Sequence, residues 1–148
     1  IDEHREKIWI LLESGGGTVD ELVKRIERAG VLVTFNGIRF DVPFMEQSMK
    51  MKIPDTPHLD LMYLLRRLGL RGGLKRIERE LGLLREDDIA DVNGYEAVRL
   101  WYRWERQGDV GALEKLCRYN AADVVNLKPL ADMAYDMMAK KVFQVTRI

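Results

Sequence analysis

The chain has 148 residues, 47% of them hydrophobic, and its 24 Lys and Arg balance 24 Asp and Glu. This length and composition are ordinary for one globular domain with its own core. Zero net charge argues against nucleic-acid binding through overall charge alone. No run approaches the roughly 20 apolar residues of a membrane span, and no signal peptide is visible at the start. The single Cys117 is expected to be buried, which suits a reducing cytoplasm, and without Cys/His clusters no structural zinc site is expected.

The first part of the chain predicts a strand, a helix and a second strand. Residues 8–12 are a short apolar run. Thr18 followed by Glu21 has the spacing of a capping box, and apolar residues at helical spacing continue to Gly30. Residues 31–35 are β-branched or apolar and uncharged, as in a buried strand. The order predicts a crossover unit of the α/β class.

The following segment predicts a site at the end of that strand. Asn36-Gly37 marks a turn, and Pro43 suits the first turn of a new helix. In α/β sheets, sites usually form at the carboxyl ends of strands. Another short strand is expected at 58–61, continuing into a helix that ends near Gly69. A short helix should end at Gly82.

The last third predicts helices only. In residues 95–106, Tyr95, Val98 and Tyr102 recur at helical spacing and share one stripe of a predicted helix, with Trp101 near it. Residues 112–127 should form a second helix that packs on the sheet. Pro129 should kink or end it, because proline lacks an N–H and crowds the preceding turn. Residues 130–141 should continue as helix.

Positive charge is concentrated between residues 66 and 85, where the only acidic residues are Glu78 and Glu80. Two interpretations stay open, a solvated helix face and a strip that contacts phosphates. The basic residues are Arg66, Arg67, Arg71, Lys75, Arg76, Arg79 and Arg85.

Several acidic residues are candidates for chemistry. Tyr119 and Asp123 are four apart in a predicted helix and lie on one face, at the edge of its apolar stripe. A carboxylate at that position needs a partner. The partner is either a structural one, a neighbouring backbone group or an arginine, or a bound metal ion. Asp41 has an N-cap as its alternative role. For His58 and Asp60, the alternative to a role in the chemistry is a purely structural role.

Four segments in order resemble the DEDD family of RNase H-like 3′–5′ exonucleases, in its tyrosine form. The same family includes the proofreading domains of family-B DNA polymerases and predicted RNase H-like exonucleases. Residues 36–43 (NGIRFDVP) resemble the second exonuclease motif, and residues 119–123 (YNAAD) resemble the third, Tyr-x3-Asp. Residues 58–61 (HLDL) and 73–82 (GLKRIERELG) are similar to elements between them. The resemblance extends from about residue 8 to about residue 130.

This resemblance implies an α/β fold with an RNase H-like mixed sheet flanked by helices, in a single domain over 1–148. It implies hydrolysis of single-stranded nucleic acid with two Mg²⁺ or Mn²⁺ ions, hard cations that prefer carboxylate oxygens. Asp41 and Asp123 would be metal ligands, with carboxylates within about 8 Å of each other. Tyr119 would orient the attacking water. Asn36, Phe40, Arg71 and Lys75 would contact substrate, and His58 and Asp60 would support the site.

One departure from the family is clear. The first motif, Asp-x-Glu on the central strand, is absent upstream of Asp41. We therefore expect an N-terminally incomplete domain, whose missing strand comes from an upstream segment or a partner chain, or a rearranged and inactive one. Without that strand, residues 31–35 should have an unpaired edge. The leading hypothesis is an exonuclease. The alternatives are a non-catalytic nucleic-acid-binding or scaffolding module, and a generic α/β domain with accidental matches.

Overall fold

A computed structural model of the chain describes residues 19–144. The expected strand at 8–12 and the capping residue Thr18 lie outside this range. None of the described helices is both long and apolar enough to cross a lipid bilayer. The elements are α1 (Val19–Arg28), β1 (Leu32–Thr34), α2 (Asp41–Ser48), β2 (His58–Asp60), α3 (Leu61–Arg67), α4 (Leu74–Glu80), α5 (Asp87–Ala90), α6 (Gly94–Gln107), α7 (Val110–Val125) and α8 (Leu127–Gln144).

The described sheet consists of two parallel strands. β1 pairs with β2 in the register Leu32 with His58 and Thr34 with Asp60, and α2 lies between them in the chain. This confirms the expected strands near 31–35 and 58–61. The described residues are mostly helical, which is consistent with the α/β class. Parallel strands need such a crossover connection, because a tight turn can join only antiparallel neighbours.

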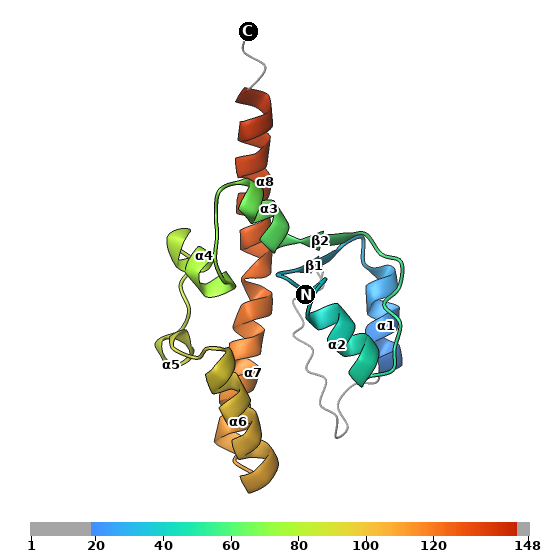
Figure 1. The fold of residues 1–148 in the computed structure, drawn as a ribbon, viewed down its shortest axis with the longest axis vertical. Helices are drawn as coiled ribbons and strands as arrows, with labels where there is room; N and C mark the ends of the chain where they lie inside the picture. The colour runs from blue at the N-terminus through green and yellow to red at the C-terminus, as the bar shows by residue number, and fades with distance from the viewer. Residues whose placement is uncertain (1–18, 145–148) are drawn as a thin grey trace.

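α7 and α8 form a nearly continuous rod along the length of the molecule (Figure 1). The sheet with α1 and α2 lies on one side of this rod, and α4 and α5 lie on the other. α7 ends at Val125, four residues before Pro129. Pro129 has no N–H to donate to the backbone carbonyl of Val125, four residues earlier, and its ring crowds that carbonyl. The expected helix end is therefore confirmed.

The main core connects the sheet to the rod. Its centre is formed by fully buried side chains of α3, α4 and α8, and Val33 and Leu59 of the two strands pack against it. α3 follows β2 without a break and its apolar face lies on α8. The core therefore holds the strand ends close to α4 and to the rod. Its buried members are Leu61, Leu65, Leu70, Ile77, Leu130 and Ala134.

A second, smaller core lies where α5 and α6 meet α7. It consists of Ile89, Val92, Leu100 and Ala112, and Tyr119 packs against its edge. The expected packing of the helix at 112–127 on the sheet does not hold for the two described strands, since the main neighbour of α7 is α6. The reason is that its small and apolar side chains complement those of α6, which is joined to it by a short turn at Gly108.

The helix expected at 95–106 is present as α6, but its aromatic stripe is not the face that it buries. Tyr95 is 75% exposed, and Val98 and Tyr102 are exposed as well. Leu100 is the residue that α6 buries, and Ala97 packs beside it. The shallow contact with α7 accommodates small side chains, so tertiary packing selected a face that hydrophobicity alone did not predict. Cys117, expected to be buried, is only partly buried.

Candidate functional site

Tyr119 and Asp123 lie one turn apart on α7, as their spacing predicts. Their side chains interact, since each of the two groups shifts the pKa of the other. Tyr119 packs against the smaller core, whereas the side chain of Asp123 is 28% exposed. The helix therefore presents a carboxylate with a fixed phenol beside it, at a position that solvent reaches.

Arg85 supplies the charge that balances Asp123. Its Nη1 lies 2.6 Å from Oδ1 of Asp123. On its other side it donates two hydrogen bonds to Glu78, from Nε to Oε2 at 2.7 Å and from Nη2 to Oε1 at 2.8 Å. Asn126 donates a further hydrogen bond to Oε1 of Glu78 at 3.0 Å. The Arg85 and Glu78 side chains are 5% and 1% exposed, so a buried, two-pronged ion pair anchors the guanidinium.

The surroundings of this cluster shift its protonation equilibria. Desolvation is the main reason that the pKa of Asp123 is raised, although Arg85 and Tyr119 act in the opposite direction. Desolvation, followed by the charge of Asp123, raises the pKa of Tyr119. Tyr119 therefore keeps its proton at neutral pH and remains a hydrogen-bond donor. For Arg85, desolvation lowers the pKa, but the bonds to Glu78 and Asp123 outweigh it and the net shift is upward.

Lys75 lies over the Tyr119 ring, with Nζ 5.0 Å from the ring centroid, and donates to the backbone carbonyl of Ala90 at 3.0 Å. Desolvation, and next the charge of Arg85, lower the pKa of its amine. In this position Lys75 connects α4 to α5 and to the candidate site. Its amine is thus close to the site but partly engaged by backbone.

Asp60 closes the turn that follows β1. Its buried carboxylate accepts hydrogen bonds from the backbone N–H groups of Asn36 at 2.7 Å, Ile38 at 3.2 Å and Met62 at 3.1 Å. Asn36 has a φ of 63°, a conformation that this turn requires. Asp60 thereby holds the segment resembling the second exonuclease motif against β2 and the start of α3. The resemblance implies that Asp60 supports a metal site, and that role stays a prediction.

His58 and Asp41 lie on either side of this turn. Nε2 of His58 is 2.9 Å from Oγ1 of Thr34, which links β2 to β1. Asp41 is the first residue of α2 and is exposed, and no side-chain cap precedes it. Desolvation by neighbouring atoms raises the pKa of Asp41, its own backbone hydrogen bond lowers it, and the charge of Asp60 raises it further. Phe40, expected to contact substrate, is 66% exposed.

Asp41 and Asp123 have the oxygen chemistry that Mg²⁺ or Mn²⁺ prefers. Among the side chains that the structure describes, residues 19–143 without 87 and 88, however, no group of three or more His, Cys, Asp or Glu is arranged to hold a metal ion. Asp123 is instead paired with Arg85. The described residues are therefore not a complete metal centre. The expected approach of Asp41 to Asp123 stays a prediction.

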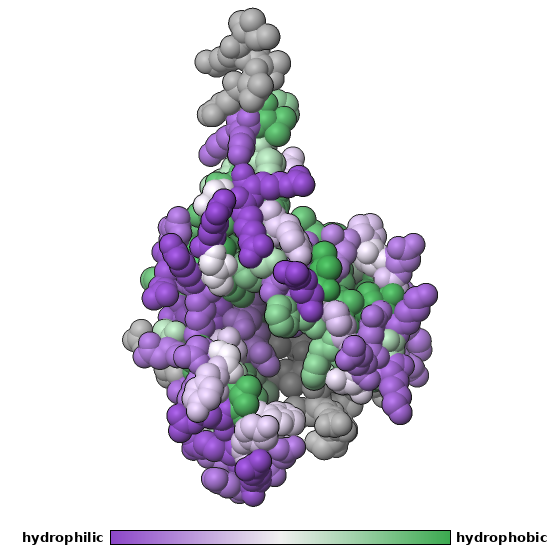
Figure 2. All heavy atoms as spheres, viewed as in Figure 1, coloured by the Kyte–Doolittle hydropathy of each residue, from purple (hydrophilic) through white to green (hydrophobic). Residues whose placement is uncertain are grey.

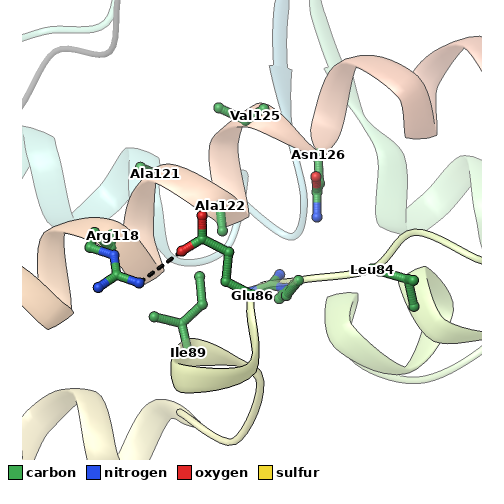
Figure 3. A pocket seen from close by; sticks show the side chains of 9 residues that line it. Leu84, Glu86, Ile89, Arg118, Ala121, Ala122, Val125 and Asn126 are labelled. Atoms are coloured by element: carbon green, nitrogen blue, oxygen red, sulfur yellow. Dashed lines mark hydrogen bonds and ion pairs between the residues drawn. The ribbon is translucent and has the colours of Figure 1, made fainter.

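A pocket of about 280 Å³ opens beside the cluster, between α7 and the segment that leads into α5 (Figure 3). Arg118 and Glu86 form an ion pair of 2.7 Å across it. Arg85 reaches it from the interior. Its lining residues are Leu84, Arg85, Glu86, Ile89, Arg118, Ala121, Ala122, Val125 and Asn126.

Glu78 is the participant that sequence reasoning missed. Leu74, Ile77 and Leu81 define the apolar face of the short helix, and Glu78 is adjacent to them at helical spacing. An acidic residue on such a face needs a buried partner. That pattern was a usable signal, but it does not reveal that Arg85, beyond the helix, is the partner.

Comparison with known proteins identifies the family. A family model described as RNase H superfamily matches residues 12–135, most of the chain. The chain belongs to the RNase H superfamily. This excludes the alternative of an unrelated α/β domain with accidental matches, and it implies a nuclease or another nucleic-acid-related function. Searches of curated proteins and of solved structures found no significant match.

Proposed function

We propose that this RNase H superfamily chain is a metal-dependent 3′–5′ exonuclease domain acting on single-stranded nucleic acid. The observation that carries the proposal is the Tyr119–Asp123 pair, one turn apart on one face of α7. It occurs in a segment with the Tyr-x3-Asp pattern of the DEDD exonucleases. The proposal includes a larger RNase H-like mixed sheet to which β1 and β2 belong.

Two Mg²⁺ or Mn²⁺ ions would supply the activated water and stabilise the leaving oxygen. Asp123 and Asp41 are the proposed donors from the described residues. Because these two carboxylates are not enough, the proposal requires further carboxylates, in the Asp-x-Glu arrangement, from an upstream segment or a partner chain. Metal dependence therefore belongs to the assembled site and not to residues 19–144 alone.

The chain's own residues have separate tasks in this proposal. The Tyr119 hydroxyl, which stays protonated because its pKa is raised, would orient the attacking water beside Asp123. Asn36 and Phe40 would lie against the substrate strand, Phe40 through its exposed ring. Arg71 and Lys75 would contact phosphates. Asp60 and His58 hold the β1–α2 turn in place through the bonds described above.

One observation favours a second candidate, a non-catalytic nucleic-acid-binding or scaffolding module. The Arg85 guanidinium already neutralises Asp123, and Glu78 anchors it. A permanently paired carboxylate would be a poor metal ligand. Mn²⁺ binding distinguishes the two candidates, because an assembled exonuclease site binds the ion and a degenerate site does not.

The test of the exonuclease proposal uses single-stranded DNA and RNA oligonucleotides labelled at the 5′ end, incubated with the full-length natural protein and Mg²⁺ or Mn²⁺. We expect a ladder of products shortened one nucleotide at a time from the 3′ end, and no cleavage in EDTA. A 3′-phosphorothioate linkage should slow the first step. No products with either metal, from a chain that includes Asp-x-Glu, would favour the non-catalytic module.

Replacing Tyr119 with phenylalanine should lower the rate of hydrolysis far more than the affinity for substrate, because the hydroxyl's proposed partner is the water. We expect kcat to fall by about 10- to 100-fold, with oligonucleotide affinity measured in EDTA within about twofold of the parent. Tyr102→Phe on the exposed face of α6 is the matched control. An equal loss of affinity and rate would identify the phenol as a substrate-binding group instead.

A further inference from the structure

A second hollow lies away from the cluster around Asp123, at the junction of α3 and α4. It has a volume of about 280 Å³ and is lined by Arg66, Arg71 and Gly72. Arg66 is in the last turn of α3, and Arg71 follows in the connection to α4. Both side chains are exposed, so two guanidinium groups border one solvent-filled depression.

The backbone of this connection lies against a third arginine, Arg76, which does not itself line the hollow. Gly72 has a φ of 120°, which side chains rarely adopt. A Cβ built on Gly72 would lie 2.8 Å from Cδ of Arg76, so the stem of Arg76 covers this glycine. Nearby, Nζ of Lys141 donates to the backbone carbonyl of Arg67 at 2.9 Å and places a further cation beside α3.

The charges at this hollow are not balanced by acidic partners. Residues 61–77 contain five basic and no acidic side chains. In the described part of the chain, Arg66, Arg71 and Arg76 form no ion pair, in contrast to the anchored Arg85. Figure 2 shows hydrophilic side chains gathered where α3 lies against α8. Adjacent unpaired guanidinium groups repel one another, and a bound anion would relieve that repulsion.

The hollow is connected to the candidate site by two consecutive residues of α4. Arg76 covers Gly72 at the hollow, and Lys75 lies over the Tyr119 ring. α4 therefore directs one basic side chain toward each of the two places, on faces about 100° apart. A flexible, negatively charged strand that ends at the pair of Tyr119 and Asp123 can contact both.

We propose that the hollow formed by Arg66, Arg71 and Gly72 binds a backbone phosphodiester of the single-stranded nucleic acid, at a phosphate other than the one cleaved. The proposal rests on the proposed function for the class of its ligand. Arginine suits this task because its planar fork donates two hydrogen bonds to one phosphate. The hollow would hold the strand while its terminal nucleotide is at Asp123.

The test measures fluorescence anisotropy of a labelled single-stranded 12-nucleotide probe in EDTA, so that no hydrolysis is needed. The double variant Arg66→Gln/Arg71→Gln should bind about threefold to tenfold more weakly for each arginine removed. The slope of log Kd against log salt should decrease by about 0.7, the value for one phosphate of a single strand. Thermal unfolding of the variant should match the parent, since both side chains are exposed.

The control is Arg28→Gln/Arg99→Gln, which removes the same charge from exposed arginines on α1 and α6. Unchanged affinity in Arg66→Gln/Arg71→Gln, or an equal loss in the control, would overturn the proposal. So would competition by inorganic phosphate or a mononucleotide as strong as that of the unlabelled oligonucleotide, which would indicate a free-anion site. A chain that binds the probe through the hollow but never hydrolyses it would refute only the exonuclease function.

Discussion

Replacing Arg85 with methionine is expected to lower the free energy of unfolding by about 3–5 kcal/mol, the usual effect of breaking a buried ion pair from one side. The substitution would leave the Glu78 carboxylate buried with only Asn126 as its remaining partner. It would also remove the counter-charge of Asp123. Urea unfolding measures the effect, and the midpoint of thermal unfolding should fall by roughly 10 °C.

Arg79→Met is the matched control, because Arg79 is on the exposed side of the same helix as Glu78. It should change stability by about 0.5 kcal/mol or less. The double variant Glu78→Leu/Arg85→Met should recover much of the loss, since it removes both buried charges together. Equal losses in the two single arginine variants would show that the Glu78–Arg85 pair contributes no special stability.

Replacing Asp123 with asparagine is expected to lower the hydrolysis rate of the assembled exonuclease by roughly 1000-fold or more, because the proposed metal donor loses its charge. The fold should persist, since Arg85 keeps both hydrogen bonds to Glu78 and the asparagine amide has nearly the same size as the carboxylate. Single-turnover degradation of a labelled oligonucleotide measures the rate. Cooperative thermal unfolding reports on the fold.

Asp132→Asn serves as the control, because Asp132 is an exposed carboxylate on α8 that pairs only with Lys128 one turn away. It should leave the rate unchanged. An Asp123→Asn variant that hydrolyses as fast as the parent would refute the role assigned to Asp123. Mn²⁺ affinity measured on both variants separates a lost ligand from lost folding, since only Asp123→Asn should weaken it.

Local patterns in the sequence were sufficient for the two described strands. The uncharged, β-branched run at 31–35 predicted β1, and the shorter run at 58–61 predicted β2, because extended backbone and burial favour such residues. Pro129 predicted the break between α7 and α8, since a proline disrupts the backbone hydrogen bond to the residue four positions before it. The four-residue spacing likewise placed Tyr119 and Asp123 on one face.

The packing partners of the helices required the tertiary structure. Tyr95, Val98 and Tyr102 have the period of a buried face, yet α6 buries Leu100 and Ala97 because the surface of α7 accepts small side chains. Periodicity ranks the faces of one helix by hydrophobicity. It contains no information about the shape of the neighbour.

For the site, the sequence by itself determined which residue types are present and their order: a turn before Asp41, and a phenol one helical turn from Asp123. Only the tertiary structure decided that Arg85 joins Glu78 to Asp123, and that Asp60 holds the turn at Asn36. The physical reason is that local spacing sets direction within one helix or turn. Charge pairing in a buried site depends instead on which distant segments the hydrophobic cores bring together, and those cores connect α3, α4 and α8, and α5, α6 and α7.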